Sequence, residues 1–169
     1  MHVTRTYLQL TDARQFRAAL GVFPGISLAP VPDPGPELYR HCYRTVGAQY
    51  RWRDRWDWTD EQIRAHLADP AISLHVARRG DALAGYYELR HVADDDSVEI
   101  AYFGLVQSEL GRGLGKHLLS CAVQDAWAVR PTRVWVHTCT LDHPNALPNY
   151  LARGFVPYKT EQYEVDSAA

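Results

Sequence analysis

A glycine-rich turn between an apolar strand and a helix constrains the fold of this chain more than any other feature. The turn reads Leu110-Gly111-Arg112-Gly113-Leu114-Gly115-Lys116. Residues 98–106 before it are an apolar run, and residues 113–129 after it carry apolar side chains at helical spacing. The free N–H groups and the dipole of such a helix start favour phosphate. The turn therefore predicts an anion site between a strand and a helix, or else a helix start that binds nothing.

Two better-known phosphate loops do not match this turn. A Walker loop needs glycine five residues before Gly115 and serine or threonine after Lys116, where the chain has Leu110 and His117. A dinucleotide loop needs the spacing G-x-G-x-x-G, whereas the turn has G-x-G-x-G. A nucleotide hydrolase thus remains only as an alternative. It predicts that ATP, rather than CoA, protects the protein against thermal unfolding.

Hydrophobic periodicity predicts the remaining elements. The expected strands cover residues 3–10, 72–77, 83–90, 98–106, 134–137 and 155–165, the first of them at a sheet edge. The expected helices cover residues 37–49, 60–70, 113–129 and 146–153, with a further short helix ending at Ala19. Thr59-Asp60-Glu61-Gln62 has the form of a capping box, and the proline-rich segment 30–36 predicts a loop.

Size, charge and cysteine content narrow the class of protein. A chain of 169 residues with 46% apolar residues predicts one domain, residues 1–169. Its 18 basic and 20 acidic residues predict neither a nucleic-acid nor a membrane partner. The first ten residues contain no long apolar run, which favours a cytoplasmic protein. Three scattered cysteines without zinc-site spacing favour reduced thiols and no metal.

Two motifs in order resemble the GNAT (GCN5-related N-acetyltransferase) superfamily. Residues 99–105 and the glycine turn resemble its motif A, a strand followed by Q/R-x-x-G-x-G/A. Ala146-Leu147-Pro148-Asn149-Tyr150-Leu151-Ala152-Arg153-Gly154-Phe155 resembles its motif B, commonly A-x-x-x-Y-x-x-x-G-F. The likeness covers about residues 72–165. It departs from the family pattern at Leu110, where Gln or Arg is usual, at Gln107, where Pro is common, and at His143, where Asn is frequent.

The resemblance implies a fold, a cosubstrate and site residues. The fold is α/β (α+β), a mixed, mostly antiparallel twisted sheet flanked by helices, with two central strands splayed around the pantetheine arm of acetyl-CoA. Leu105 and Val106 would contact pantetheine through their backbone, and the N–H of Val106 would bind the oxyanion. Tyr150 would donate a proton to the CoA thiolate. The pyrophosphate would lie on Gly111, Arg112, Gly113, Leu114, Gly115 and Lys116.

The chemistry of amine acetylation requires a base. An alkyl amine with a pKa near that of lysine, about 10.4, is protonated at neutral pH and must lose a proton before it attacks a thioester. Glu99, which matches the catalytic glutamate of some family members, is the first candidate for this base, acting directly or through a water molecule. Strand alternation predicts that it shares one face with Ala101, Phe103 and Leu105. An exposed strand carboxylate paired with Arg90 or another cation is the structural alternative.

Two polar segments are candidates for the acceptor pocket. His137 or His143 is an alternative base, and Asp142 would orient one of the two. The polar groups of the same run would equally serve to cap the helix near Ala146. No motif supports metal ligation by His137, Asp142 and His143. A thiol nucleophile at Cys139 is disfavoured because the resemblance implies direct transfer. The segment Arg51–Trp58 matches the early pocket wall of the family, so Trp52 and Trp56 would line the pocket, unless they only pack helices onto the sheet.

The sequence therefore predicts an acetyl-CoA-dependent N-acetyltransferase acting on a primary amine, with a small molecule favoured as acceptor. A protein lysine or N-terminal acetyltransferase is the first alternative, and a non-catalytic acyl-CoA-binding sensor is the second. The sequence leaves a homodimer open.

Overall fold

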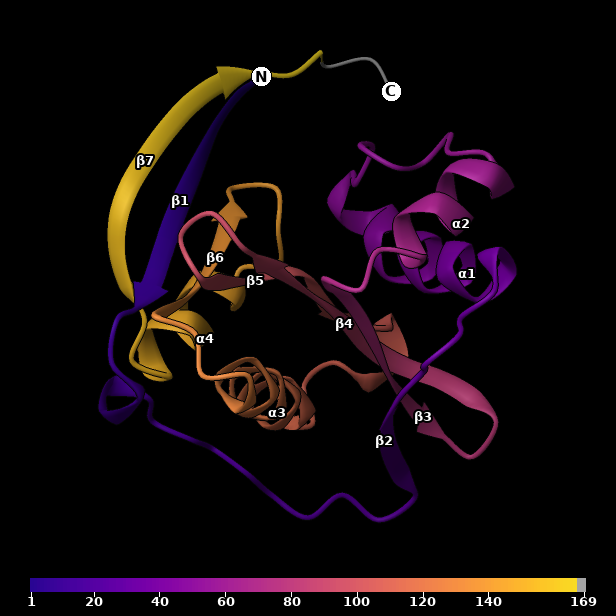
Figure 1. The fold of residues 1–169 in the computed structure, drawn as a ribbon, viewed down its shortest axis with the longest axis horizontal. Helices are drawn as coiled ribbons and strands as arrows, with labels where there is room; N and C mark the ends of the chain where they lie inside the picture. Colours follow the sequence, from indigo (N-terminus) through magenta and orange to yellow (C-terminus); the bar gives the residue numbers. More distant parts are fainter. Residues whose placement is uncertain (167–169) are drawn as a thin grey trace.

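A computed structural model describes residues 1–166 as one seven-stranded sheet with helices on both faces (Figure 1). The strands are β1 (His2–Leu10), β2 (Ile26–Pro30), β3 (Ile72–Arg79), β4 (Ala82–Val92), β5 (Ser97–Leu105), β6 (Arg133–Cys139) and β7 (Val156–Glu164). The helices are α1 (Pro36–Gly47), α2 (Asp60–Leu67), α3 (Leu114–Ala128) and α4 (Ala146–Ala152). The capping box at Thr59 is present, with both of its reciprocal hydrogen bonds.

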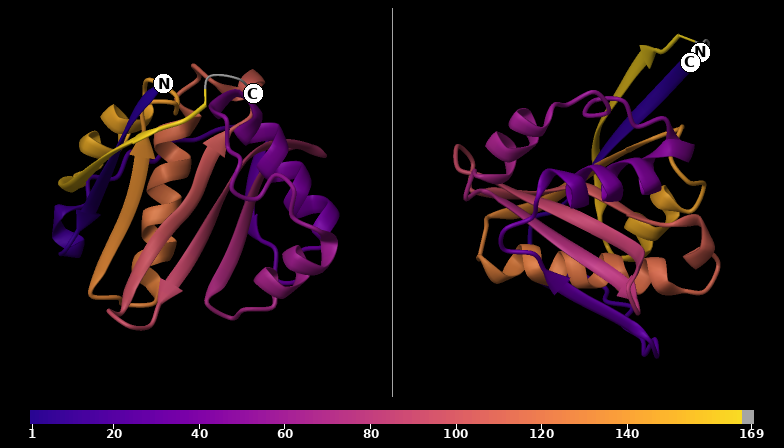
Figure 2. Two further views of the ribbon diagram at one scale, coloured as in Figure 1. Left: turned by 90° about the horizontal axis from the view of Figure 1, so that it is seen from above. Right: turned by 90° about the vertical axis from the view of Figure 1, so that its right-hand side faces the viewer.

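The sheet has the order β2-β3-β4-β5-β6-β1-β7. Every neighbouring pair is antiparallel except β5 and β6, which are parallel. Helices α1 and α2 lie on one face of the sheet and α3 on the other, as the right-hand view of Figure 2 shows. The mixed, mostly antiparallel sheet flanked by helices is thereby confirmed.

The two central strands separate along their length. β5 pairs with β6 only from Ser97 to Glu99, opposite Arg133 to Trp135. Beyond these residues no ladder joins the two strands, so one edge of β5 has free N–H and C=O groups. The splay predicted between the central strands is confirmed.

A bulge in β5 changes which face its side chains occupy. Glu88 of β4 pairs with Tyr102 and the next residue, Leu89, pairs with Ile100, so Ala101 is the extra residue. After it, Phe103 and Leu105 pack on the α3 face together with Ile100. The prediction that Glu99 and Leu105 share a face is therefore wrong, because one inserted residue reverses the alternation.

The N-terminal part of the chain differs most from its prediction. β1 lies inside the sheet between β6 and β7, and β2 is an edge strand that the sequence analysis left unassigned. The helix expected up to Ala19 is only a 3₁₀ turn at Ala13–Gln15. Beyond that turn, the N–H groups of Ala19 and Gly21 bond to Ser120 Oγ and His117 Nδ1 of α3, at 2.8 and 3.1 Å. Side chains of α3 thus accept hydrogen bonds from backbone N–H groups that would otherwise bond within a helix.

Candidate functional site

Two cavities adjoin β5, and the larger of the two lies in the splay between β5 and β6. It has a volume of about 750 Å³. The glycine turn and α4 line one part of it, and the segment 50–54 with β1, β6 and the end of β7 lines another. Ten of the residues predicted to form the site line it: Trp52, Leu105, Gly111, Gly113, Gly115, Lys116, His137, Asp142, His143 and Tyr150.

The glycine turn has the conformation of an anion site. Gly111 and Gly113 have φ of 76° and 80°, in the left-handed region that favours glycine. Gly113 is the N-cap of α3, and no side chain caps this end of the helix. Its first N–H groups therefore lack a side-chain acceptor. Arg112 does not line the cavity, and Leu114 is a buried core residue, so any contact of these two is through the backbone.

A bidentate ion pair anchors the segment before the turn. Glu109, 5% exposed, accepts from Arg79 of β3 at 2.7 Å (Nε to Oε1) and 2.9 Å (Nη2 to Oε2). The guanidinium of Arg79 lowers the pKa of this carboxyl group through these hydrogen bonds. The pair ties the turn to the sheet, which limits its freedom to move.

Tyr150 of α4 is held rigidly against the cavity. Its ring makes edge contacts with Phe103 and Phe155, and the residue is 5% exposed. Its hydroxyl makes no hydrogen bond to any residue between 1 and 166 in the structure. Burial, and secondarily the charge of Asp142, raises its pKa, so the phenol keeps its proton at neutral pH. The neighbouring Asn149 donates to Gly115 O at 3.3 Å and joins α4 to the turn.

The backbone donors at the cavity differ from those expected. The N–H of Val106 donates to Ala84 O at 2.9 Å, so the expectation that it would bind an oxyanion is wrong. This antiparallel bond fixes the alternation of the strand, in which every second N–H points to β4. The N–H groups of Phe103 and Leu105 therefore point to the splay, where both residues line the cavity.

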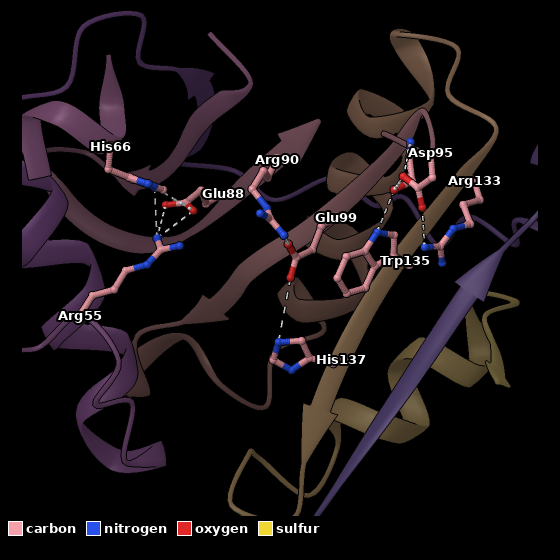
Figure 3. Close-up of polar contacts among 10 residues, drawn as sticks. Arg55, His66, Glu88, Arg90, Asp95, Glu99, Arg133, Trp135 and His137 are labelled. Atoms are coloured by element: carbon pink, nitrogen blue, oxygen red, sulfur yellow. Dashed lines mark hydrogen bonds and ion pairs between the residues drawn. The ribbon is translucent and has the colours of Figure 1, made fainter. Parts of the chain in front are cut away.

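Glu99 lies outside the larger cavity. It is 7% exposed and lines a second, polar cavity of about 380 Å³. Its Oε2 accepts from Arg90 Nε at 2.9 Å and lies 2.7 Å from Arg90 Nη2 (Figure 3). The alternative of a carboxylate paired with Arg90 thus describes the contacts of Glu99, although the carboxylate is buried rather than exposed.

His137 lies at the boundary of the two cavities and lines both. Its Nε2 is 4.0 Å from Glu99 Oε1, and Figure 3 shows Glu99 between His137 and Arg90. Burial and the positive charge of Arg5 lower the pKa of His137, and Glu99 offsets this only in part. The imidazole is therefore neutral at neutral pH, which is the protonation state a base requires.

A buried ionic cluster stands beside the second cavity. Glu88 is fully buried and accepts from Arg55 Nη1 at 2.8 and 2.9 Å and from Tyr39 Oη at 2.9 Å. His66 Nε2 lies 3.2 Å from its Oε2 (Figure 3). The cluster joins β4 to α1, α2 and the segment between them, and so positions the wall formed by residues 50–54.

The other residues predicted to line the acceptor pocket differ in where their side chains lie. Trp52 lines the cavity, where its ring contacts Tyr102 with 4.9 Å between centroids. Trp56 does not line it, and its ring contacts the guanidinium groups of Arg44 and Arg53. Asp142 accepts from Thr138 Oγ1 and Cys139 N at 2.6 and 3.0 Å, and thus holds the loop rather than a histidine.

His143 also serves its own loop. Its Nδ1 accepts from Asn145 N at 3.0 Å, and its carbonyl accepts from Ala146 N at 2.8 Å. These bonds close the loop before α4, but Asn145, the N-cap of α4, makes no side-chain capping bond, so the polar run does not cap the helix as that alternative expected. Of the two candidate bases, only His137 has a ring that makes no hydrogen bond to another described residue.

Sequence analysis gave no role at the site to several residues of the cavity, among them Arg5, Asn149, Arg153 and Tyr163. Arg5 and Tyr163 belong to the first and last strands, whose place in the sheet depends on pairings more than 120 residues apart in the chain. Asn149 and Arg153 lie within motif B, so the motif itself was the available signal.

Comparison with protein families assigns most of the chain. Residues 36–155 match the family described as "Acetyltransferase (GNAT) family". The chain belongs to this family. GNAT enzymes are acyltransferases that generally use acetyl-CoA. No curated protein is similar enough in sequence to count as a relative.

Solved structures share the fold of this GNAT chain at low sequence identity. A GCN5-related N-acetyltransferase from Kribbella flavida is 19% identical, with a TM-score of 0.64 over 93% of this chain and 55% of that one. One from Sphaerobacter thermophilus is 15% identical, with a TM-score of 0.67 over 94% and 49%. The chain thus spans about half the length of both.

A shorter neighbour is covered more fully. It is an aminoglycoside acetyltransferase from an uncultured soil metagenomic sample, crystallised with trehalose. It is 15% identical, and the match, with a TM-score of 0.63, covers 76% of this chain and 87% of that one. At such identities these likenesses bear on the fold alone. None of the helices within residues 1–166 has the length and apolar composition that a membrane crossing needs.

Proposed function

We propose that this GNAT chain transfers an acetyl group from acetyl-CoA to a primary amine of a small molecule. One observation carries the proposal. A single cavity brings together an uncapped helix start at the glycine turn, the buried phenol of Tyr150 and the neutral imidazole of His137. These are an anion site, a proton donor and a proton acceptor, which are the groups that acyl transfer to an amine requires.

The residues at the turn fit the diphosphate of CoA. Lys116 lines the cavity beside Gly111, Gly113 and Gly115, and the N-terminus of α3 adds its dipole. Arg153 lines the same cavity, and its Nε and Nη1 are buried without a hydrogen-bond partner in the described part of the chain. Buried guanidinium nitrogens without acceptors are costly unless a ligand anion satisfies them.

Bound acetyl-CoA would supply a thioester carbonyl that a neutral amine can attack. His137 would take the amine proton. The carboxylate of Glu99 near Nε2 favours the tautomer with the proton on that atom, so Nδ1 keeps the lone pair that accepts. Glu99 would then stabilise the imidazolium, which makes it a positioning residue rather than the base itself.

Two further groups complete the transfer. The N–H groups of Phe103 and Leu105 point to the splay and would hold the carbonyl oxygen as negative charge develops on it. When the carbon–sulfur bond breaks, Tyr150 Oη would give its proton to the sulfur. The neutral amine thus gains the acetyl group and loses one proton to His137, while the thiolate gains one from Tyr150. Transfer of the imidazolium proton to the phenolate through water would restore the enzyme.

The test is thiol release from acetyl-CoA in the presence of a panel of small amines, with peptides that carry lysine or a free N-terminus as the alternative acceptors. We expect acetylated small amines in mass spectra. Acetylated peptides with no small-molecule product would favour the protein acetyltransferase instead. Tight binding of acetyl-CoA with no product from any acceptor would favour the sensor.

The pH profile gives a specific prediction for His137. Because burial and Arg5 lower its pKa, kcat should fall only as the pH drops below 6.5, the ordinary value for histidine. His137→Gln should lower kcat by about 100-fold or more and abolish this acidic limb. Glu99→Gln removes a charge that raises the pKa of His137, so the limb should move to lower pH. An unchanged limb in both variants would assign the base elsewhere.

A further inference from the structure

An arginine of the first strand reaches the larger cavity without an anionic partner. Arg5 of β1 lies opposite Cys139 of β6 and Glu161 of β7, and it lines the cavity. Its guanidinium stands over the ring of Tyr163, 5.0 Å from the centroid. Its Nε is buried and has no hydrogen-bond partner within residues 1–166. Such a donor has lost its water without gaining an acceptor, which is unfavourable unless a ligand supplies one.

The carboxylates nearest in the sheet are already engaged. Glu161 accepts from Tyr7 Oη at 2.8 Å and pairs with Lys159 at 2.5 Å. Asp142 accepts from the hydroxyl of Thr138 and the N–H of Cys139. No carboxylate among the described residues forms an ion pair with Arg5. The positive charge of Arg5 is thus available to a ligand in the cavity.

Arg5 is a close neighbour of His137. The register pairs Arg5 with Cys139 and Tyr7 with His137, which places the two side chains on the same face of adjacent strands. The charge of Arg5 is also one of the causes that lower the pKa of His137, after burial. An anionic group held by Arg5 would therefore lie beside an amine that delivers its proton to His137.

We infer that the acceptor is an amine that carries a carboxylate close to its nitrogen, as an amino acid does, and that Arg5 binds this carboxylate. The inference rests on the proposed function and names its substrate class. A planar guanidinium forms two parallel hydrogen bonds to a carboxylate. The second cavity offers no such site, because its arginines, Arg55 and Arg90, are bonded to Glu88 and Glu99.

The remainder of such an acceptor has an aromatic surface to contact. Tyr50, Trp52 and Tyr102 line the same cavity, and the rings of Trp52 and Tyr102 meet edge to face. Aromatic walls of this kind favour apolar and aromatic groups. Phenylalanine and phenethylamine are therefore suitable probes, since they share the aromatic group and the amine but differ in the carboxylate.

The kinetic test compares these two amines across variants of Arg5. We expect Arg5→Gln to raise KM for phenylalanine about tenfold to a hundredfold and to leave KM for phenethylamine within about twofold, because only the first loses charged hydrogen bonds. Arg5→Lys should restore part of the difference. Arg14→Gln, an exposed arginine of the same N-terminal segment, is the matched control. If Arg5→Gln raised KM for both amines equally, the inference would be overturned. The same holds if Arg53→Gln, and not Arg5→Gln, raised KM selectively for phenylalanine.

A binding measurement separates this inference from the proposed function. N-acetylphenylalanine carries the carboxylate and N-acetylphenethylamine does not, so calorimetry on the wild type and Arg5→Gln needs no turnover. Tighter binding of the first compound that Arg5→Gln abolishes supports the site at Arg5. Equal binding of both compounds rejects it even if amines are acetylated. Arg5-dependent binding without any acetylation retains the site and rejects the transferase.

Discussion

Tyr150→Phe is expected to lower kcat for acetyl transfer by about 100-fold to 10,000-fold, the range typical of a lost general acid. The substitution removes only the hydroxyl, whose hydrogen-bonding capacity no described side chain uses. The ring contacts with Phe103 and Phe155 remain, so the fold and the affinity for acetyl-CoA should not change. Steady-state thiol release and calorimetric titration with acetyl-CoA measure the two quantities separately.

The control for this experiment is Tyr158→Phe. Tyr158 of β7 is 42% exposed and lines neither cavity, so its variant should keep the activity of the wild type. Because the pKa of Tyr150 is raised, its phenol should stay protonated up to pH 10, and kcat of the wild type should not fall at alkaline pH up to that value. A Tyr150→Phe enzyme with more than a tenth of the wild-type kcat would mean that the sulfur receives its proton from another source.

Glu88→Gln is expected to lower the free energy of unfolding by about 3–5 kcal/mol, the cost of breaking a buried ion pair on one side. The variant leaves the guanidinium of Arg55 in a buried position without its carboxylate. Chemical denaturation followed by fluorescence measures the change. Tyr86→Phe is the matched control on β4, since the hydroxyl of Tyr86 is buried without a partner among the described residues and its removal should cost nothing.

The difference in unfolding free energy between the wild type and Glu88→Gln should also depend on pH. Burial raises the pKa of Glu88, but the hydrogen bond from His66 and the charge of Arg55 outweigh burial and hold it below 4.5. A carboxyl group with a lowered pKa contributes fully above pH 4.5 and loses its contribution as the pH falls through the folded-state value. The gap between wild type and Glu88→Gln should therefore shrink in acid. A gap that is constant from pH 3 to pH 7 would contradict the ionised form of the cluster.

Local sequence signals predicted the elements that local interactions determine. The glycine turn, the helix after it and the capping box at Thr59 depend on residues within one or two turns of each other, and all three are present. Tyr150 was located by motif B, whose short helix closes at Gly154 with φ of 97°. These features need no knowledge of distant partners, because backbone geometry and capping decide them.

The features that escaped prediction depend on long-range pairing. The bulge at Ala101 interrupts an apolar strand with no proline or glycine at that point, so sequence alternation assigned Glu99 to the wrong face. The position of β1 between β6 and β7 depends on partners at the far end of the chain, and with it the arrival of Arg5 at the cavity. Periodicity identifies a strand but not its neighbours.

Calorimetric titration of acetyl-CoA tests the central claim, that the N–H groups at the start of α3 bind the CoA diphosphate. Gly113→Asn and Gly113→Asp make a matched pair, because both residues tolerate the left-handed conformation of Gly113 and only aspartate adds negative charge. The account predicts one bound acetyl-CoA per wild-type chain, and affinity at least about tenfold weaker for Gly113→Asp than for Gly113→Asn. No binding to the wild type, or equal affinity of the two variants, would contradict it.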